Sequence, residues 1–406
     1  MSEWKKVKLR DCCHSISDGD HLPPPKSESG VPFITIANID ATNHIDFGST
    51  MFVPFEYYEN LNDIRKARCN DILYSVVGSF GEPVLIKENK PFAFQRHIAI
   101  LRPNNEIADS HYLYYVMLSR DFYMQADTVA IGAAQRTISL TALRNMEVEL
   151  PPIEVQHRIA TILSRYDSLI ENYQKQIKLL EEAAQRLYKE WFVDLHFPGH
   201  ENTKIVDGVP EGWEKNTIND VCTLITSGST PSRNKNSYWE DGTIRWVKTK
   251  ELLDSWILDT EEYITQEGYN NSSTKLFPAN TILMAIYASP TLGRLGILSG
   301  ECCCNQAALG LIADEKVISW QWLFWKLYEL RDEFNAIARG AGQQNISGIV
   351  VKNKEIVIPA KRVIDGFTSV VSTMFEQQKN LQSQIRLLTE ARDRLLPKLM
   401  SGEIAV

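Results

Sequence analysis

The sequence predicts a mixed α+β protein made of two similar globular domains that are separated by two long, antiparallel coiled-coil helices. Two features carry this prediction. The chain repeats itself once at a nearly constant offset, and each copy ends in a long heptad pattern of apolar residues. The composition agrees, because 406 residues with 44% hydrophobic and 23% charged side chains are typical of two or three globular domains.

The repeat runs through the whole chain. Trp4, Asp11, Cys13 and Gly19 recur as Trp213, Asp220, Cys222 and Gly228. Residues 70–73 resemble 280–283, Gln95 aligns with Gln306, the loop 132–135 resembles 340–343, and 176–180 resembles 384–388. An offset that stays between 208 and 211 predicts two halves with the same fold, related by a pseudo-two-fold axis.

Each half begins with short apolar runs that are bounded by Gly, Pro, Asn and Ser, a pattern that predicts strands. In the first half these runs are 31–36, 71–77 and 97–101, and in the second half they are 244–247, 281–286 and 308–312. Aromatic-rich helices are expected at 110–121 and 319–333. Trp322, Trp325 and Tyr328 of the second could stack on bases, but their helical spacing favours packing in the core.

Each half ends in a heptad pattern, at 151–197 and at 359–406. The predicted seam is formed by Ile159, Leu163, Tyr166, Ile170, Tyr173, Ile177, Leu180 and Leu187 in the first helix and by Phe367, Val371, Met374, Leu381, Ile385, Leu388 and Leu395 in the second. Gln378 and Arg392 interrupt the second seam, either as markers of register or because the seam is locally solvated. Helices of this length span about 50–60 Å, and pairing them covers both apolar stripes.

Motifs for catalysis are absent from the sequence. It has no Walker A motif, no strand–G-x-G-x-x-G–helix arrangement and no Asn/Asp-Pro-Pro-Tyr/Phe loop for methyl transfer. Seven cysteines, three of them adjacent at 302–304, lack the C-x-x-C spacing of a zinc site, so we expect no metal and buried, reduced thiols. No apolar run is long enough to span a membrane, and the charged N-terminus is unlike a signal peptide, which predicts a cytoplasmic protein.

The net charge of −8 predicts that the isolated chain would hold DNA weakly. Local basic clusters do occur, at 65–68, 233–235 and 245–250. Basic partner subunits would then have to supply much of the affinity for a nucleic acid.

Several strings resemble the specificity subunits of Type I restriction–modification systems. Residues 150–160 (LPPIEVQHRIA) resemble the beginning of that family's first long helix, and 209–213 (VPEGW) the start of its second target-recognition domain. The strings 229–231 (STP) and 395–404 (LLPKLMSGEI) resemble further parts of the second half. One departure is 21–25 (HLPPP), which stands where the family usually has a Thr-Pro loop.

The resemblance implies a first target-recognition domain at 1–150, a first conserved helix at 151–197, a linker and second target-recognition domain at 198–358, and a second conserved helix at 359–406. We call the two recognition domains the first and second heads. Each head would read one half of a split site in double-stranded DNA, and the helices would set the gap. Two methyltransferase subunits would dock on the helices, and endonuclease/translocase subunits would join them. S-adenosylmethionine, ATP and Mg²⁺ would belong to those partners, so this chain would have no cofactor and no catalytic residue.

Polar side chains in loops between strands are the candidates for base contacts. They are Thr35, Asn38, Ser79, Gln135 and Arg136 in the first head and Lys248, Lys250, Thr291, Arg294, Gln343, Gln344 and Asn345 in the second. Two alternatives remain at this point: a helical scaffold that does not read DNA sequence, and an enzyme with divergent motifs.

Overall fold

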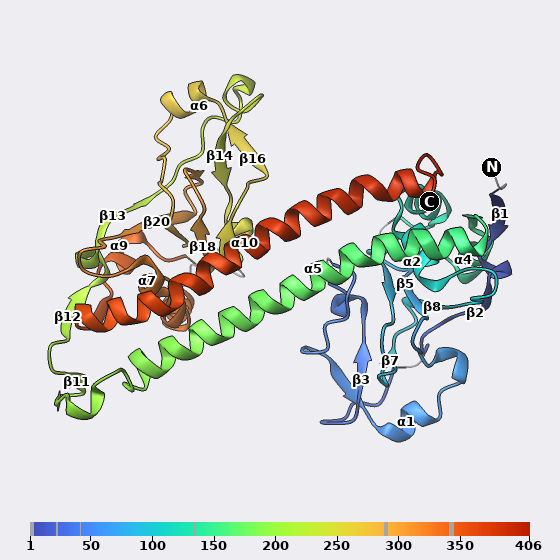
Figure 1. The fold of residues 1–406 in the computed structure, drawn as a ribbon, viewed down its shortest axis with the longest axis horizontal. Helices are drawn as coiled ribbons and strands as arrows, with labels where there is room; N and C mark the ends of the chain where they lie inside the picture. Colours follow the sequence, from blue (N-terminus) through green and yellow to red (C-terminus); the bar gives the residue numbers. More distant parts are fainter. Residues whose placement is uncertain (1–3, 22, 41, 134, 288–290, 341–344) are drawn as a thin grey trace. The chain divides into compact units, whose positions relative to one another are not determined.

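The computed structural model describes all residues except 1–3, 22, 41, 134, 288–290 and 341–344. It divides into two compact units (Figure 1). The first unit contains Met1–Ile170 and Leu388–Val406, and the second contains Glu171–Leu387. Each unit therefore combines one head with segments of both long helices.

The first unit has a four-stranded antiparallel sheet in the order β2-β8-β5-β6 and a three-stranded sheet in the order β4-β3-β7. Its strands are β1 (Lys5–Lys8), β2 (Cys13–Asp18), β3 (Val31–Ile34), β4 (Met51–Val53), β5 (Ile72–Ser75), β6 (Pro83–Leu85), β7 (Ala93–Phe94), β8 (Ile98–Pro103) and β9 (Glu147–Leu150). β1 and β9 pair separately. The runs predicted at 31–36, 71–77 and 97–101 coincide with β3, β5 and β8.

The helices of the first head are α1 (Phe55–Glu59), α2 (Ser110–Leu118), α3 (Arg120–Val129) and α4 (Leu140–Asn145). Asp109, Ser119 and Ser139 cap the last three by accepting a backbone N–H from the first turn. α2 packs on the main sheet in a core that includes Leu9, Tyr74, Leu101 and Tyr112. α2 and the four-stranded sheet thus share one hydrophobic core.

The second unit repeats this architecture. Its main sheet has the order β13-β20-β17-β18-β15, and its three-stranded sheet has the order β16-β14-β19. The strands are β10 (Ile205–Val206), β11 (Val209–Pro210), β12 (Glu214–Thr217), β13 (Cys222–Ser227), β14 (Ile244–Val247), β15 (Ser255–Ile257), β16 (Glu262–Ile264), β17 (Ile282–Ala285), β18 (Leu295–Leu298), β19 (Cys303–Cys304), β20 (Ala308–Ala313) and β21 (Glu355–Ile358). β14, β17 and β20 confirm the predicted strands, and the pair β12–β21 corresponds to β1–β9.

The helices of the second head are α6 (Gln266–Asn270), α7 (Trp320–Glu329), α8 (Arg331–Gly340) and α9 (Gly348–Lys352). The aromatic residues of α7 face inward: Trp322 is 1% exposed and Trp325 is 5% exposed. Both tryptophans belong to the core, and Tyr328 is half-buried against it, which agrees with the packing that their helical spacing predicts.

The strand ladders correct one detail of the repeat. Ser75 pairs with Ile98 in the first head, and Ala285 pairs with Ala308 in the second, so Ile98 corresponds to Ala308. The alignment of Gln95 with Gln306 is therefore off by one residue, and the structural counterpart of Gln306 is Arg96. The ladder decides this point, because a shift by one residue would turn every side chain of a strand to the opposite face.

The two long helices are α5 (Ile153–Tyr188), which continues as a π-helical turn at Lys189–Val193, and α10 (Lys361–Met400). In the first unit the beginning of α5 packs with the end of α10, where Arg392 bonds to Asp167 at 2.7 Å. In the second unit the end of α5 packs with the beginning of α10, where the rings of Tyr188 and Phe367 lie 6.1 Å apart. Both contacts are those of antiparallel partners.

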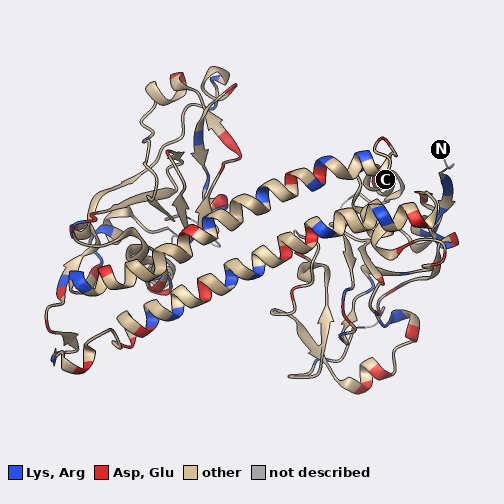
Figure 2. Ribbon diagram, in the orientation of Figure 1, with Lys and Arg blue, Asp and Glu red and all other residues tan. Residues whose placement is uncertain are grey.

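Burial along the predicted seam is uneven. Ile159, Leu163, Ile170, Phe367, Val371 and Leu381 are buried, whereas Tyr166, Tyr173, Ile177, Leu180, Leu187, Met374, Ile385, Leu388 and Leu395 are half-buried. The fully buried positions near the helix ends belong to the cores of the heads, which cover the seam there. Of the two polar interruptions, Gln378 is buried and Arg392 forms an ion pair with Asp167. Lys/Arg and Asp/Glu residues are spread along both helices (Figure 2).

Candidate nucleic-acid interface

One end of the main sheet in the first head gathers several predicted loop residues. β2 and β5 end there, and β6 and β8 begin there. The loop from β5 to β6 turns through Gly78 and Gly81, both at positive φ, and the Gly81 N–H donates to the Ser75 carbonyl at 3.0 Å. Ser79 is exposed at the tip of this loop.

A second loop lies against this tip. The Gly78 N–H donates to the Arg136 carbonyl at 3.0 Å, and the Ile138 N–H donates to the Val76 carbonyl at 2.8 Å. Ser79, Gln135 and Arg136 are thereby brought together although 56 residues separate the first two. Gln135 is exposed, whereas the Arg136 guanidinium binds Asp127 and lies 5.1 Å from the centre of the Phe80 ring.

The second head repeats this arrangement at the same end of its sheet. The Gly293 N–H donates to the Ala285 carbonyl at 2.9 Å, as Gly81 does to Ser75. The Ile346 N–H donates to the Ile286 carbonyl at 2.8 Å, which places Asn345 beside the β17–β18 loop with Thr291 and Arg294. Within the described part of the chain the guanidinium of Arg294 has no side-chain partner, and it is half-exposed. Gln343 and Gln344 lie outside the described residues.

Thr35 and Asn38 lie after β3 and bind one another. The Thr35 hydroxyl and backbone N–H both donate to the Asn38 side-chain oxygen at 2.9 Å, which caps the 3-10 turn Ile36–Asn38. Asn38 is buried, and its amide nitrogen donates to the Ser49 carbonyl at 3.5 Å. These two side chains therefore use their hydrogen bonds to shape the loop.

Lys248 occupies the same place in the second head, before the 3-10 turn Thr249–Glu251. Its ammonium donates to Glu262 at 2.5 Å, and Lys250 pairs with Glu261 at 2.6 Å. The hydrogen bond with Glu262 raises the pKa of Lys248, and the bond with Lys250 lowers the pKa of Glu261. Both lysines are thus paired with carboxylates in the free protein.

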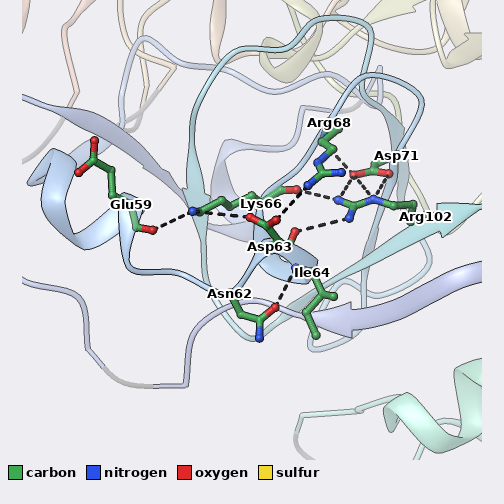
Figure 3. A network of polar contacts seen from close by, with 8 residues as sticks. All are labelled: Glu59, Asn62, Asp63, Ile64, Lys66, Arg68, Asp71 and Arg102. Carbon is green, nitrogen blue, oxygen red and sulfur yellow. Dashed lines mark hydrogen bonds and ion pairs between the residues drawn. The ribbon is translucent and has the colours of Figure 1, made fainter.

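The basic clusters of the sequence are similarly paired. Figure 3 shows the network that contains Lys66 and Arg68, which both reach Asp63. Arg65 lies within 4 Å of Asp18 and Asp20. In the second head Arg233 stacks 3.6 Å from the Trp239 ring centre and pairs with Glu262 at 2.6 Å. In each head, carboxylates of the same head therefore neutralise much of the positive charge of the basic clusters.

A turn that sequence analysis did not single out lies beside the loops of each interface, where Val76 N–H donates to the His97 carbonyl and Ile286 N–H to the Ala307 carbonyl. It joins β7 to β8 in the first head and β19 to β20 in the second, so it connects the two sheets of each head. Arg96 and Gln306 are its exposed residues. The sequence repeat indicates this turn, but the alignment of Gln95 with Gln306 is shifted by one residue and so does not pair Gln306 with Arg96.

No group of three or more His, Cys, Asp or Glu side chains that could hold a metal ion is found where the structure is described. Over the same residues, no helix is long and apolar enough to cross a membrane.

The family model for the Type I restriction modification DNA specificity domain matches residues 1–182 and 210–385, once in each half of the repeat. The chain belongs to this family. As a Type I specificity subunit it is the non-catalytic member of its system, and its mixed fold of two specificity domains separated by a long helix is that of the family.

Relatives cover the chain from end to end. It is 24% identical over 477 aligned residues to the HindI specificity subunit of Haemophilus influenzae, which covers all of both chains. It is 28% identical to the MjaIX specificity subunit of Methanocaldococcus jannaschii, over 73% of this chain and 69% of that protein. The crystal structure of the Type I S subunit from M. genitalium aligns with 98% of this chain and 96% of its own at a TM-score of 0.64 and 16% identity, so it shares the fold.

Proposed function

We propose that this specificity subunit reads a two-part DNA site, with each head contacting one half. The observation that carries the proposal is the repeated interface: the same sheet end, the same Gly-containing loop and the same neighbouring loop occur in both heads, but with different side chains. Arg294 corresponds to Glu82, because the Arg294 carbonyl accepts from Ala285 N–H as the Glu82 carbonyl accepts from Ser75 N–H. Equivalent frames with different polar groups suit the reading of two different sequences.

The candidate base contacts are the twelve loop residues that the sequence indicates. Ser79, Gln135, Arg136, Thr291, Arg294 and Asn345 lie on the adjoining loops, while Thr35, Asn38, Lys248 and Lys250 lie on the turns after β3 and β14. Gln343 and Gln344 belong to the same proposal by sequence. Since both lysines are ion-paired in the free protein, DNA phosphates would have to compete with Glu261 and Glu262 for them.

The paired long helices would set the gap between the half-sites and dock two methyltransferase subunits. Helices of 36 and 40 residues are about 54 and 60 Å long. Leu179 and Leu387, which occupy equivalent positions on α5 and α10, are 64% and 59% exposed. Because both copies of the repeat expose a leucine at this position, the two leucines are candidates for contacts with the two methyltransferase subunits. S-adenosylmethionine, ATP and Mg²⁺ would be bound by the methyltransferase and endonuclease/translocase subunits, in the cytoplasm where the DNA is.

Exchanging the first head tests the proposal. Residues 1–150 are replaced by the first head of another specificity subunit, and the chimera is expressed with its methyltransferase partner. Sequencing of methylated sites is expected to show a change in one half-site, with the other half and the gap retained. A change in both halves would contradict the assignment of one head to one half-site. Methylation without any sequence preference would favour the scaffold function instead.

A further inference from the structure

The turn between the two sheets of each head has the same backbone in both. In the first head the Ile98 N–H donates to the Gln95 carbonyl at 3.1 Å, so Arg96 and His97 are the central residues of a β-turn. In the second head the Ala308 N–H donates to the Asn305 carbonyl at 3.2 Å, around Gln306 and Ala307. Arg96 and Gln306 are thus the first central residues of equivalent turns.

Backbone hydrogen bonds to both sheets fix each turn. The Gln95 N–H donates to the Ile34 carbonyl at the end of β3, and the Val76 N–H donates to the His97 carbonyl. The second head repeats both bonds, from Asn305 to Val247 and from Ile286 to Ala307. A side chain at such a turn projects from a rigid frame, so little conformational entropy of the backbone is lost when it binds.

The side chains at these two positions are exposed and chemically distinct. Within the described residues, the guanidinium of Arg96 has no ion pair or hydrogen-bond partner, although most other arginines of the first head have one. The Gln306 side-chain oxygen accepts the Thr230 hydroxyl at 2.6 Å, which orients the amide and leaves a lone pair on that oxygen. Among the residues that the structure describes, none accepts a hydrogen bond from its amide nitrogen, which is therefore available to a ligand.

These groups match different bases in the major groove. A guanidinium donates two hydrogen bonds to O6 and N7 of guanine, and a carboxamide both accepts from N6 and donates to N7 of adenine. We propose that this turn is a base-reading position of each head, at which Arg96 selects guanine in one half-site and Gln306 selects adenine in the other. The proposal rests on the function proposed above and assigns a base to one position of each half-site.

Reciprocal substitutions test the assignment. Arg96→Gln is expected to change one guanine of the first half-site to adenine in the methylated motif, and Gln306→Arg to change one adenine of the second half-site to guanine. The other half-site and the gap should be unaltered in each variant. Arg120→Gln is the matched control, because Arg120 is an exposed arginine on α3 of the same head, outside these loops. Its motif should be that of the unmodified protein.

If a variant no longer supports methylation, DNA binding by the assembled methyltransferase complex is measured instead. With oligonucleotides that carry each of the four bases at every half-site position, Arg96→Ala should lose roughly 5- to 150-fold in affinity for the preferred base, at one position only. Thermal unfolding of the complex shows whether the variant is folded, and Gln306→Ala provides the same test in the other head.

Two results would overturn the inference. One is an unchanged motif in both reciprocal variants, and the other is an equal loss of affinity for all oligonucleotides, which would assign Arg96 to a phosphate. If the head exchange still changes one half-site, either result rejects only the base assignment. If the head exchange changes neither half, the proposed function itself is wrong.

Discussion

Replacing one buried ion pair of the first head by the uncharged pair that occupies the same positions in the second head should show that the stability effects of the two residues depend on each other. Asp71 is 2% exposed and accepts from Arg102 at 2.8 and 3.0 Å (Figure 3). Arg102 also donates to the Lys66 carbonyl at 2.8 Å, and its hydrogen bond with Asp71 raises its pKa. The strand ladders place Thr281 and Ile312 at the corresponding positions of the second head.

The magnitude follows from the burial of the two groups. Arg102→Ile leaves the Asp71 carboxylate buried without its charged donor, and removing one partner of a buried pair costs about 3 kcal/mol. The Arg102 side chain is only 18% exposed, so water compensates little. Asp71→Thr combined with Arg102→Ile removes the charge as well. It leaves the Lys66 carbonyl without its donor and the Arg68 N–H without its Asp71 acceptor, and because neither residue is buried we expect a cost of about 1 kcal/mol. Adding Asp71→Thr to the Arg102→Ile variant is therefore expected to recover about 2 kcal/mol of stability.

Hydrogen exchange followed by mass spectrometry measures this effect locally. Amide protection in β5 and β8 should fall about 150-fold in Arg102→Ile and about fivefold in the double variant, since 1.4 kcal/mol corresponds to a factor of ten. Peptides from β17 and β20 should be unchanged and serve as the internal reference. Equal losses of protection in the single and double variants would refute the argument, because they would show that the uncompensated Asp71 charge is not what destabilises the head.

Three further predictions concern the interface, the helices and the thiols. Arg294→Ala should weaken binding of the cognate DNA site by the methyltransferase complex by about 1–3 kcal/mol, measured by titrating the complex with that DNA. Lys316→Ala, beyond the opposite end of β20, is the control and should leave the affinity unchanged, and equal effects of the two substitutions would remove Arg294 from the interface. Paired insertions of seven residues, between Lys175 and Gln176 and between Ser383 and Gln384, keep the heptad phase and add about 10 Å to each helix. Methylated sites should then show a gap about three base pairs longer, with activity lowered because one half-site is rotated relative to the other. If a folded, active variant methylates only sites of the original spacing, the helices do not set the gap. Burial raises the pKa of Cys302 to about 12 and of Cys303 to about 11. Alkylation at pH 8 should therefore label the partly exposed Cys69 in the native protein and reach residues 302–304 only after unfolding. Labelling of residues 302–304 as fast as Cys69 in the native protein would show instead that this strand opens readily.

The twofold architecture could be predicted because its signals are local and repeated. Heptad spacing at 151–197 and 359–406 indicates helices α5 and α10, and apolar runs between turn residues indicate β3, β5, β8 and their counterparts. Loop residues such as Ser79 and Gln135 could be selected as exposed polar groups. Their proximity could not, since it depends on a hydrogen bond between Gly78 and Arg136 on separate loops.

What the sequence determined by itself is the repeat, the order of elements and the absence of motifs for catalysis, because each depends on residue type and short-range spacing. The tertiary structure alone decided which charges are available. Lys248 and Arg65 are basic residues in the sequence, and the structure shows that carboxylates of other strands and loops pair with both of them in the free protein. It also decided the strand register that makes Arg96 the counterpart of Gln306. Register is set by pairing between strands that are far apart in the chain, and it determines which residues occupy equivalent positions of the two turns.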